Sequence, residues 1–395
     1  MSLLASGNKS MKRNYTIGFD ARYANVEGST IGSYSRLMVE ALATACPEEC
    51  YARMYIPRRR ALSEFKALDE QHNIEAMEPD GLFWRKLPWA WHLWGIGRDA
   101  ERGDVALYHG LAGELPIGLA RRNIRSVVSV HDLSFLRLRR YHNPIERTLR
   151  RLKLLHTLHL ADRIVAVSEN LKRDIVRYLK IDPDKIDVIY CGCDHSYTIA
   201  PTENKIAEVR EKYALPKRYI LNVGEQSERG NQSLIIEAMA QLDEDINLVL
   251  VGSETSYTRL LLRRAKSLGM SDRVHIINTH STVELAAIYS EALLLAHTAL
   301  YDGFATQIVE AGNIGTPVIA TKGSSMEEAG GSHSLYVNAE NHEELAAAIE
   351  RVVGDPILRH NMVERGKEYV HRFRGEVIAY NLINCYKRIN IDLMH

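Results

Sequence analysis

Four short segments of the chain combine glycine, charged and hydroxyl side chains in a way that could bind a phosphorylated ligand. Each follows a short apolar run and precedes a stretch with helical spacing: residues 28–33, 130–133, 224–231 and 301–306. Glycines let backbone N–H groups approach an anion, and the N-terminus of the next helix adds positive dipole. Each segment alone is weak evidence, because glycine is common in such turns, and neither a dinucleotide fingerprint nor a Walker motif occurs.

The last of these segments carries two carboxylates eight residues apart, Asp302 and Glu310. Eight residues of helix span about 12 Å, or roughly two turns. One carboxylate can therefore sit at the mouth of the helix while the other faces along the same side. The backbone N–H groups of Phe304, Ala305 and Thr306 would line an anion pocket between them. The alternative is that two solvated acids flank the start of a helix.

His131 and Arg229 are the other side chains that could act on a ligand. His131 ends a buried strand and would point into a cleft, although a His-Asp pair is often only a turn with a capping aspartate. Arg229 precedes a helix and could bind a phosphate, or it could be an ordinary surface residue.

Apolar runs alternate with helix-period segments along most of the chain, which predicts parallel sheets covered by helices on both faces. Two such series are separated by the polar residues 191–204. We therefore expect an α/β fold with two Rossmann-like, doubly wound domains facing across a cleft. The expected domains are residues 11–198 and 199–375, with a C-terminal helix at about 376–395 packing back on the first. Ligands of open parallel sheets bind beyond the carboxyl ends of the strands.

The bulk composition restricts the class of protein. The net charge is zero, but residues 1–200 hold 30 Lys and Arg against 24 Asp and Glu, and the remainder holds 20 against 26. The five cysteines are odd in number and form no Cys-x-x-Cys, so a disulfide framework or zinc site is not expected. No apolar run is long enough to span a bilayer, and the first dozen residues do not resemble a signal peptide. These features favour a cytoplasmic protein.

The order and text of these segments resemble family four of the retaining glycosyltransferases, which have the GT-B fold. The resemblance begins near Tyr15 and covers almost all of the chain. Its most specific stretches are FDARYANVEGSTIGSYSRLMVEAL, VVSVHDLSFLRLRRYHNP, ADRIVAVSENLKRDIVRYLKIDPDKIDVIYCGCD, YILNVGEQSERGN, SDRVHIINTHSTVELAAIYSEA and LYDGFATQIVEAGNIGTPVIAT. The resemblance implies transfer of a sugar, with retention, from a nucleotide diphosphate to a hydroxyl of a glycan or lipid-linked acceptor. It implies no metal and no cofactor.

The resemblance also assigns roles by position. His131, Arg229 and Asp302 are the catalytic candidates: His131 would contact the donor sugar, Arg229 would bind the phosphates, and Asp302 would hold the sugar hydroxyls. Glu310 would bind the ribose hydroxyls. The remaining donor-binding candidates are Gly32 near the diphosphate, Thr279 and His280 near the base, and the backbone of Phe304, Ala305 and Thr306.

Departures from the family text leave two alternatives open. Asp302 stands for the usual Glu, Ala305 for a Gly and Gln307 for a Pro, and Arg229 is followed by Gly230 without the second cation of the family. Lys322 or Arg125 could compensate for that cation. Otherwise the chain could be a degenerate, non-catalytic nucleotide-sugar-binding member. A sugar-nucleotide epimerase on the same fold is a less favoured alternative. Nucleic acid is not an expected partner, because no recognition module is present.

A membrane surface is a further expected partner. All four tryptophans fall within residues 83–94, beside Arg85 and Lys86. Residues 121–153 hold ten Lys and Arg against two acids, and Arg147, Arg150 and Arg151 could share one helix face. Such a pattern suits peripheral attachment to an anionic membrane, at its inner face for this family. It equally suits a buried tryptophan cluster and a solvated helix face.

Overall fold

The computed structural model describes residues 15–26, 28–58, 68, 70–391 and 393, which form two α/β lobes. The first lobe is built on a seven-stranded parallel sheet with the order β3-β2-β1-β4-β5-β6-β7. Its strands are β1 (Tyr15–Asp20), β2 (Cys50–Tyr55), β3 (Ile74–Met77), β4 (Val105–Gly110), β5 (Arg125–Val130), β6 (Arg163–Ala166) and β7 (Ile186–Val188). The predicted start of the domain at residue 11 lies outside the described residues.

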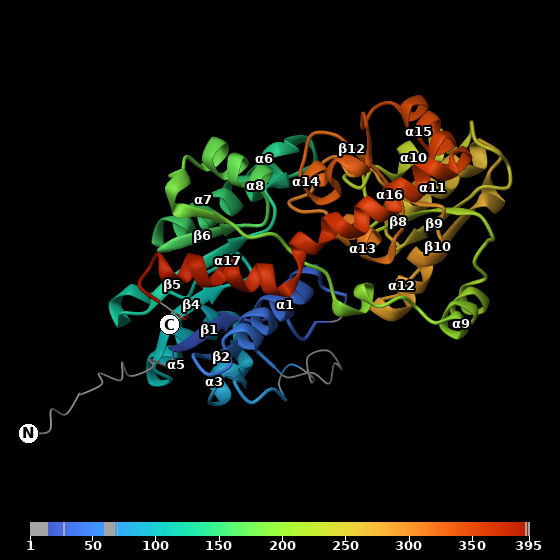
Figure 1. Cartoon of the computed structure of the whole chain (residues 1–395). Helices are drawn as coiled ribbons and strands as arrows, with labels where there is room; N and C mark the ends of the chain where they lie inside the picture. Colours follow the sequence, from blue (N-terminus) through green and yellow to red (C-terminus); the bar gives the residue numbers. More distant parts are fainter. Residues whose placement is uncertain (1–14, 27, 59–67, 69, 392, 394–395) are drawn as a thin grey trace, which may run out of the picture.

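The helices of the first lobe alternate with these strands along the chain (Figure 1). They are α1 (Thr30–Ala45), α3 (Leu82–Lys86), α4 (Pro88–Ala90), α5 (Ile96–Arg102), α6 (Ser134–Arg137), α7 (Pro144–Leu160) and α8 (Glu169–Asp174). Helix α1 begins at Thr30, because the side chain of Ser29 accepts a hydrogen bond from the N–H of Gly32 at 3.0 Å and caps the helix there.

The second lobe is built on a six-stranded parallel sheet with the order β10-β9-β8-β11-β12-β13. Its strands are β8 (Tyr219–Val223), β9 (Asn247–Val251), β10 (Val274–Ile277), β11 (Leu294–His297), β12 (Val318–Thr321) and β13 (Leu335–Val337). Its helices are α9 (Glu203–Tyr213), α10 (Gln232–Met239), α11 (Ser256–Ser267), α12 (Thr282–Glu291), α13 (Thr306–Ile314), α14 (Met326–Gly330), α15 (His342–Gly354) and α16 (Pro356–Tyr369). The predicted α/β fold with two doubly wound sheets is confirmed.

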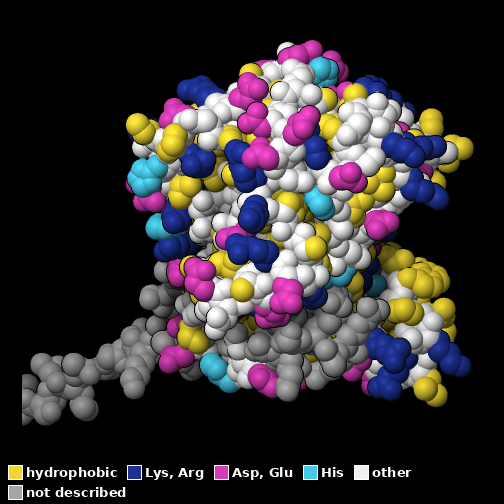
Figure 2. All heavy atoms as spheres, turned by 90° about the vertical axis from the view of Figure 1, so that its right-hand side faces the viewer, with side chains coloured by type: hydrophobic (Ala, Val, Ile, Leu, Met, Phe, Trp, Pro, Cys, Tyr) yellow, Lys and Arg dark blue, Asp and Glu magenta, His cyan; other side chains and the backbone are white. Residues whose placement is uncertain are grey.

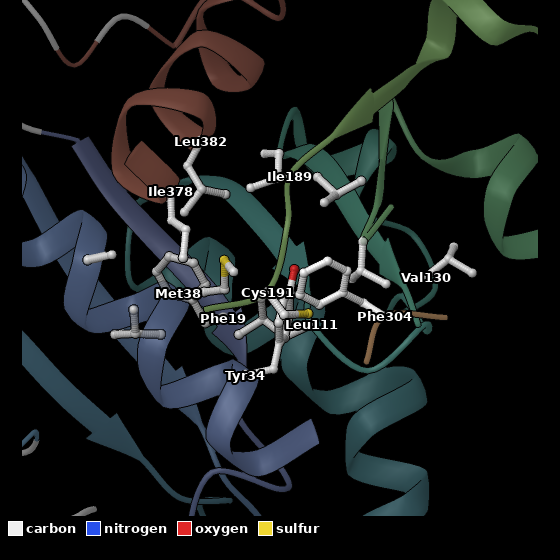
Figure 3. Packing of buried hydrophobic residues seen from close by; sticks show 14 of the residues in the cluster. Phe19, Tyr34, Met38, Leu111, Val130, Ile189, Cys191, Phe304, Ile378 and Leu382 are labelled. Carbon is white, nitrogen blue, oxygen red and sulfur yellow. The ribbon is translucent and has the colours of Figure 1, made fainter. Parts of the chain in front are cut away.

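The last helix, α17 (Gly375–Lys387), returns to the first lobe and packs on α1 (Figure 1). Tyr386 of α17 bonds Nδ1 of the buried His109 on β4 at 2.7 Å. Arg388, just after the helix, forms an ion pair with Asp187 at 2.9 Å. Ile378 and Leu382 of α17 pack into the same core as Phe19 and Met38 of the first lobe (Figure 3).

The hydrophobic core of the first lobe extends into the second. Phe304, from the second lobe, lies beside Cys191 and Val130 in Figure 3. Its ring packs against Tyr190 and Phe373, which lie on the two segments that cross between the lobes, at centroid distances of 5.5 and 5.3 Å. A separate core cluster fills the second lobe alone. Shared packing near the crossings therefore fixes how the lobes meet.

The tryptophans of residues 83–94 are neither all buried nor all exposed. Trp91 is buried and donates from its indole N–H to Asp99 at 2.7 Å. Trp89 and Trp94 are exposed and lie edge to face. Within the described part of the chain, no helix is both long and apolar enough to cross a bilayer.

Candidate active site

A cleft of about 1540 Å³ lies between the lobes, and its walls are loops at the carboxyl ends of strands in both sheets. The first lobe contributes the start of α1 and the residues after β5. The second contributes the loops after β8, β9 and β11 and one side of α13. This is the position at which open parallel sheets bind ligands.

His131 lies in the wall of this cleft, directly after β5. Its Nε2 lies 2.6 Å from the carbonyl oxygen of Leu111. A carbonyl can only accept, so Nε2 carries the proton and Nδ1 is the acceptor of the neutral ring. Burial lowers the pKa of His131, although the bond to Leu111 and the charge of Asp132 act in the other direction. The ring of Tyr34 packs against it at right angles, 4.5 Å between centroids. His131 is therefore a fixed, neutral imidazole near pH 7.

Arg229 forms an ion pair across the cleft with Oδ2 of Asp132. Burial acts to lower the pKa of Arg229, but the charges of Asp132 and Asp302 outweigh it and raise the pKa. The other oxygen of Asp132 accepts from the backbone N–H of Ser134, so the predicted capping role of Asp132 is present as well. Arg229, which the sequence predicted to bind a phosphate, is thus paired with an acidic residue of the other lobe.

The loop that follows β11 holds Arg229 and Asp302 in place. The N–H of Leu300 donates to the carbonyl of Arg229 at 2.9 Å. The backbone of Asp302 is bonded to the hydroxyls of Ser324 and Ser325 at 3.0 and 2.8 Å. Hydrogen bonds of this loop therefore hold the backbone at both residues.

The two lobes touch at Gly303. A Cβ at this position would lie 1.6 Å from the carbonyl oxygen of His131, so only glycine fits. The hydroxyl of Ser168 donates to the carbonyl of Gly303 at 2.7 Å. Close approach of the backbones brings Asp302 next to the loop that carries His131.

Helix α13 begins at Thr306 beside the cleft, with no side-chain cap at Ala305. Uncapped N–H groups at a helix N-terminus suit an anion. Ala305 is fully buried behind the surface of the cleft, and the ring of Phe304 packs between the lobes. The side chains of Phe304 and Ala305 thus serve packing, and the anion site predicted here would consist of backbone groups.

Glu310 faces the cleft one turn further along α13 and is bonded by the hydroxyl of the buried Tyr289 at 2.9 Å. Burial raises the pKa of Glu310 from 4.5 to about 7; the bond from Tyr289 opposes this shift and the charge of Asp194 adds to it. Glu310 is accordingly a poorly solvated carboxylate that would gain from ligand hydroxyl groups.

The remaining predicted residues come from both lobes, and Gly32 is not among the described residues that line the cleft. Gly32 is buried, and a Cβ there would meet the carbonyl of Tyr23 at 2.3 Å, so packing inside the lobe already requires glycine. Gly28, with a φ of +66°, lines the cleft and approaches His280 of the other lobe. Thr279 also lines the cleft, and its hydroxyl donates to Glu284 at 2.8 Å. Gly28 is therefore the glycine of this turn that faces the cleft.

Comparison with known proteins decides the family. Residues 205–369 match the family described as glycosyl transferases group 1, and residues 38–197 match Glycosyltransferase Family 4. The chain belongs to the group 1 glycosyltransferases. This glycosyltransferase is 25% identical over 287 residues to O-antigen chain mannosyltransferase B of Escherichia coli, which covers 71% of this chain and 74% of that protein.

Solved structures of similar fold agree with this assignment. The Anabaena protein HepE in complex with UDP and glucose superposes with a TM-score of 0.73 and 19% identity, over 95% of this chain and 100% of that one. Sucrose-phosphate synthase from Thermosynechococcus elongatus gives 0.77 and 20%, over 95% and 99%. At these identities the likeness establishes the GT-B fold of the glycosyltransferase.

Sequence reasoning missed two polar residues in the cleft of this glycosyltransferase, Asn222 on β8 and His297 at the end of β11. Each is a polar residue near the end of an otherwise apolar strand, and this feature of the sequence could have identified them. The two cations offered as compensation lie elsewhere: Lys322 is paired with Glu344 and Arg125 with Asp162, and neither is among the described residues that line the cleft.

Proposed function

We propose that this glycosyltransferase transfers a sugar, with retention and without a metal ion, from a nucleotide-diphosphate sugar to a hydroxyl of a glycan or lipid-linked acceptor. The observation that carries the proposal is the convergence of Arg229, the N-terminus of α13, Asp302 and Glu310 on one cleft between two Rossmann-like lobes. A cation and helix dipole suit a diphosphate, and carboxylates suit hydroxyl groups.

The charges of the leaving diphosphate would be met by Arg229 and by the first N–H groups of α13. Arg229 must then exchange Asp132 for a phosphate oxygen, because its ion pair with Asp132 spans the same cleft. Binding of the donor would thereby free Asp132. Preorganised donors of this kind stabilise developing negative charge by several kcal/mol in a site from which water is excluded, roughly 3 kcal/mol for each.

The other roles follow from the atoms that each residue offers. The Nδ1 of His131 accepts a hydrogen bond from a hydroxyl of the donor sugar, as does Asp302. Glu310 accepts from the ribose hydroxyls, and Thr279 and His280 contact the base. Gly32 supports the turn near the diphosphate. Phe304, Ala305 and Thr306 place the start of α13 against it.

We further assign the acceptor to the first lobe, residues 11–198 with the helix at 376–395, and the donor to residues 199–375. The basic first lobe would bring the enzyme to the inner face of an anionic membrane, where a lipid-linked acceptor is present. The name of the Escherichia coli relative places that protein in O-antigen assembly, which favours a polysaccharide acceptor for this chain too.

The test is a transfer assay with a panel of nucleotide sugars in the presence of a chelator. Turnover should persist in the chelator, and NMR of the product should show the anomeric configuration of the donor. Turnover that requires added magnesium or manganese would contradict the metal-free mechanism, and an inverted product would contradict retention.

Variants at Arg229 separate an enzyme from a degenerate binding protein. Arg229→Ala should lower kcat/KM by about 100-fold, as expected for loss of one preorganised donor, and Arg229→Lys should restore part of it. Donor binding without hydrolysis or transfer in the natural protein would support the degenerate alternative. Reversible epimerisation of the free nucleotide sugar would support the epimerase alternative.

A further inference from the structure

Two polar side chains in the cleft are buried without a hydrogen-bond partner for some of their atoms among the described residues. Asn222 is 3% exposed and His297 is 5% exposed, and both line the cleft. The unpartnered atoms are Oδ1 of Asn222 and both ring nitrogens of His297. They lie on adjacent strands of the second sheet, β8 and β11.

The identity of the unpartnered atom of Asn222 is fixed by its neighbour. Its Nδ2 donates to the carbonyl oxygen of Ala296 at 2.7 Å, and a carbonyl can only accept. The amide oxygen is therefore the free atom. Ala296 immediately precedes His297, so this bond ties Asn222 to the strand position next to the imidazole.

His297 lies close to a residue already assigned to the donor. Its Nε2 is 3.4 Å from Oδ2 of Asp302, an ionic contact if the ring is protonated, without a hydrogen bond. An unmade hydrogen bond in a buried group is unfavourable, and native proteins usually keep such groups only with a partner or a function. Two such residues in the lining of one binding cleft indicate that a ligand supplies the partners.

The chemistry of these atoms selects the part of the ligand. Asn222 offers an acceptor, Asp302 offers acceptors, and a neutral His297 offers one acceptor and one donor. A phosphate group is made of acceptors and would face other acceptors here, whereas a sugar hydroxyl both donates and accepts. We propose that Asn222 and His297 form, with Asp302, a subsite that binds the hydroxyl groups of the transferred sugar and determines which sugar is accepted. This inference rests on the proposed nucleotide-sugar donor.

The experiment compares each nucleotide sugar with its own nucleoside diphosphate. The natural protein is titrated calorimetrically with UDP-, GDP-, ADP- and dTDP-glucose, with GDP-mannose, and with the four parent diphosphates. His297→Leu should weaken binding of the preferred nucleotide sugar by about tenfold and leave its parent diphosphate within about twofold. His297→Gln, which keeps polar atoms, should recover part of the loss. Asn222→Leu should reproduce the effect of His297→Leu.

Thermal unfolding distinguishes this role from a structural one. His297→Leu removes two unpartnered buried nitrogens, so its Tm without ligand should equal or exceed that of the natural protein. The matched control is His275→Leu on β10, outside the described cleft lining, where Nε2 bonds Asn247 at 3.1 Å. The control should lower Tm and leave both affinities unchanged.

Three outcomes would overturn the proposal. One is an equal loss of affinity for sugar-bearing and sugar-free nucleotides, and another is no loss for either. The third is failure of both His297 variants to fold, which would make the residue structural. If the natural protein binds none of the five nucleotide sugars and none of the four diphosphates, the proposed function itself fails. That result differs from a natural protein that binds and a variant that binds equally.

Discussion

At the scale of single residues, Glu310 is a carboxylate whose ionisation is unfavourable in the empty protein. Its pKa is raised from 4.5 to about 7 because the carboxylate is buried beside Tyr289, with the charge of Asp194 nearby. A group whose pKa is higher in the folded than in the unfolded state stabilises the fold below the unfolded pKa. That stabilisation is lost as the pH rises through about 7.

We therefore predict opposite pH trends for stability and for ligand binding. Between pH 4.5 and 7 the free energy of unfolding of the empty protein should fall by up to about 3 kcal/mol from this group. Over pH 6 to 8, roughly one unit on each side of the same pKa, affinity for the nucleoside diphosphate should rise as Glu310 ionises and accepts from the ribose. Thermal unfolding and calorimetry across this range measure both.

The control for this prediction is Glu310→Gln, which has nearly the same shape and does not titrate. It should show neither trend and should bind the diphosphate more weakly at pH 8, by roughly 1.5–3 kcal/mol for a lost bond to a charged group. An unchanged pH dependence in the Gln variant would show that another group is responsible.

The sequence predicted most candidate residues of the cleft because they follow apolar strands or, like Glu310, stand at helical spacing from such a residue. His131, Arg229, Asp302 and Glu310 all lie at the cleft where that pattern placed them. The pairing of Arg229 with Asp132 was not predictable from local sequence, because the residues are 97 positions apart and meet only in the folded arrangement of the two lobes. Whether each residue binds the donor in its assigned way stays a prediction.

At the scale of elements, α14 of the second lobe caps α8 of the first. The carboxylate of Glu328 accepts hydrogen bonds from the N–H groups of Glu169 and Asn170, each at 2.7 Å. Nearby, Arg137 of α6 donates to the carbonyl of Gly323 at 2.6 Å. A carboxylate at a helix N-terminus also interacts favourably with the helix dipole. These contacts hold the lobes together on the side of the cleft where His131 and Gly303 meet.

We predict that Glu328→Ala weakens the contact between the two lobes. Loss of a charge-assisted contact of about 1.5 kcal/mol should raise KM for the donor by about tenfold and increase the radius of gyration measured by small-angle scattering. Glu327→Ala is the matched control, because Glu327 is an exposed neighbour on the same helix. Equal effects of the two substitutions would show that the hydrogen bonds between Glu328 of α14 and the N-terminus of α8 do not hold the lobes together.

Most strands were predictable because they are continuous apolar runs, and the exceptions have physical reasons. β2 contains Arg53, whose side chain bonds Glu75 and the carbonyl of Gly103 at the edge of the core. β4 contains His109, which is buried because Tyr386 and Ser129 satisfy its two ring nitrogens. Both strands read as mixed sequences until tertiary partners are known. Burial lowers the pKa of His109 to about 3, which keeps the ring neutral inside the sheet.

At the scale of the whole molecule, charge and exposed apolar surface are distributed differently. The face toward the viewer in Figure 2, which is the right-hand side of Figure 1, carries acidic and basic side chains interspersed. In the first lobe, by contrast, α7 exposes an apolar stripe, with Ile145, Leu149 and Leu152 exposed by 73%, 62% and 58%. Residues at this spacing lie on one helix face. Sequence had indicated only the arginines of this helix.

Contacts through Glu114 link α7 to the segment that carries the tryptophans. Glu114 is paired with Lys153 of α7 and also lies 3.3 Å from His92, within the tryptophan segment. Trp89 and Trp94 are exposed by 59% and 51%. Exposed apolar side chains next to arginines are typical of a surface that lies in a membrane interface, with aromatic rings at headgroup level.

We therefore predict salt-sensitive binding to anionic vesicles through α7. Each Lys or Arg near an anionic surface contributes about 1 kcal/mol, and the apolar stripe adds to it. Co-sedimentation with anionic vesicles at low salt should exceed that with neutral vesicles, and high salt should reduce it. Leu149→Glu should abolish binding. Leu260→Glu, at a leucine of α11 in the second lobe that is 47% exposed, should not. Equal, negligible sedimentation with both vesicle types would show that the stripe and tryptophans serve another contact. Unchanged binding of the Leu149→Glu variant would show that α7 is not the membrane-binding element.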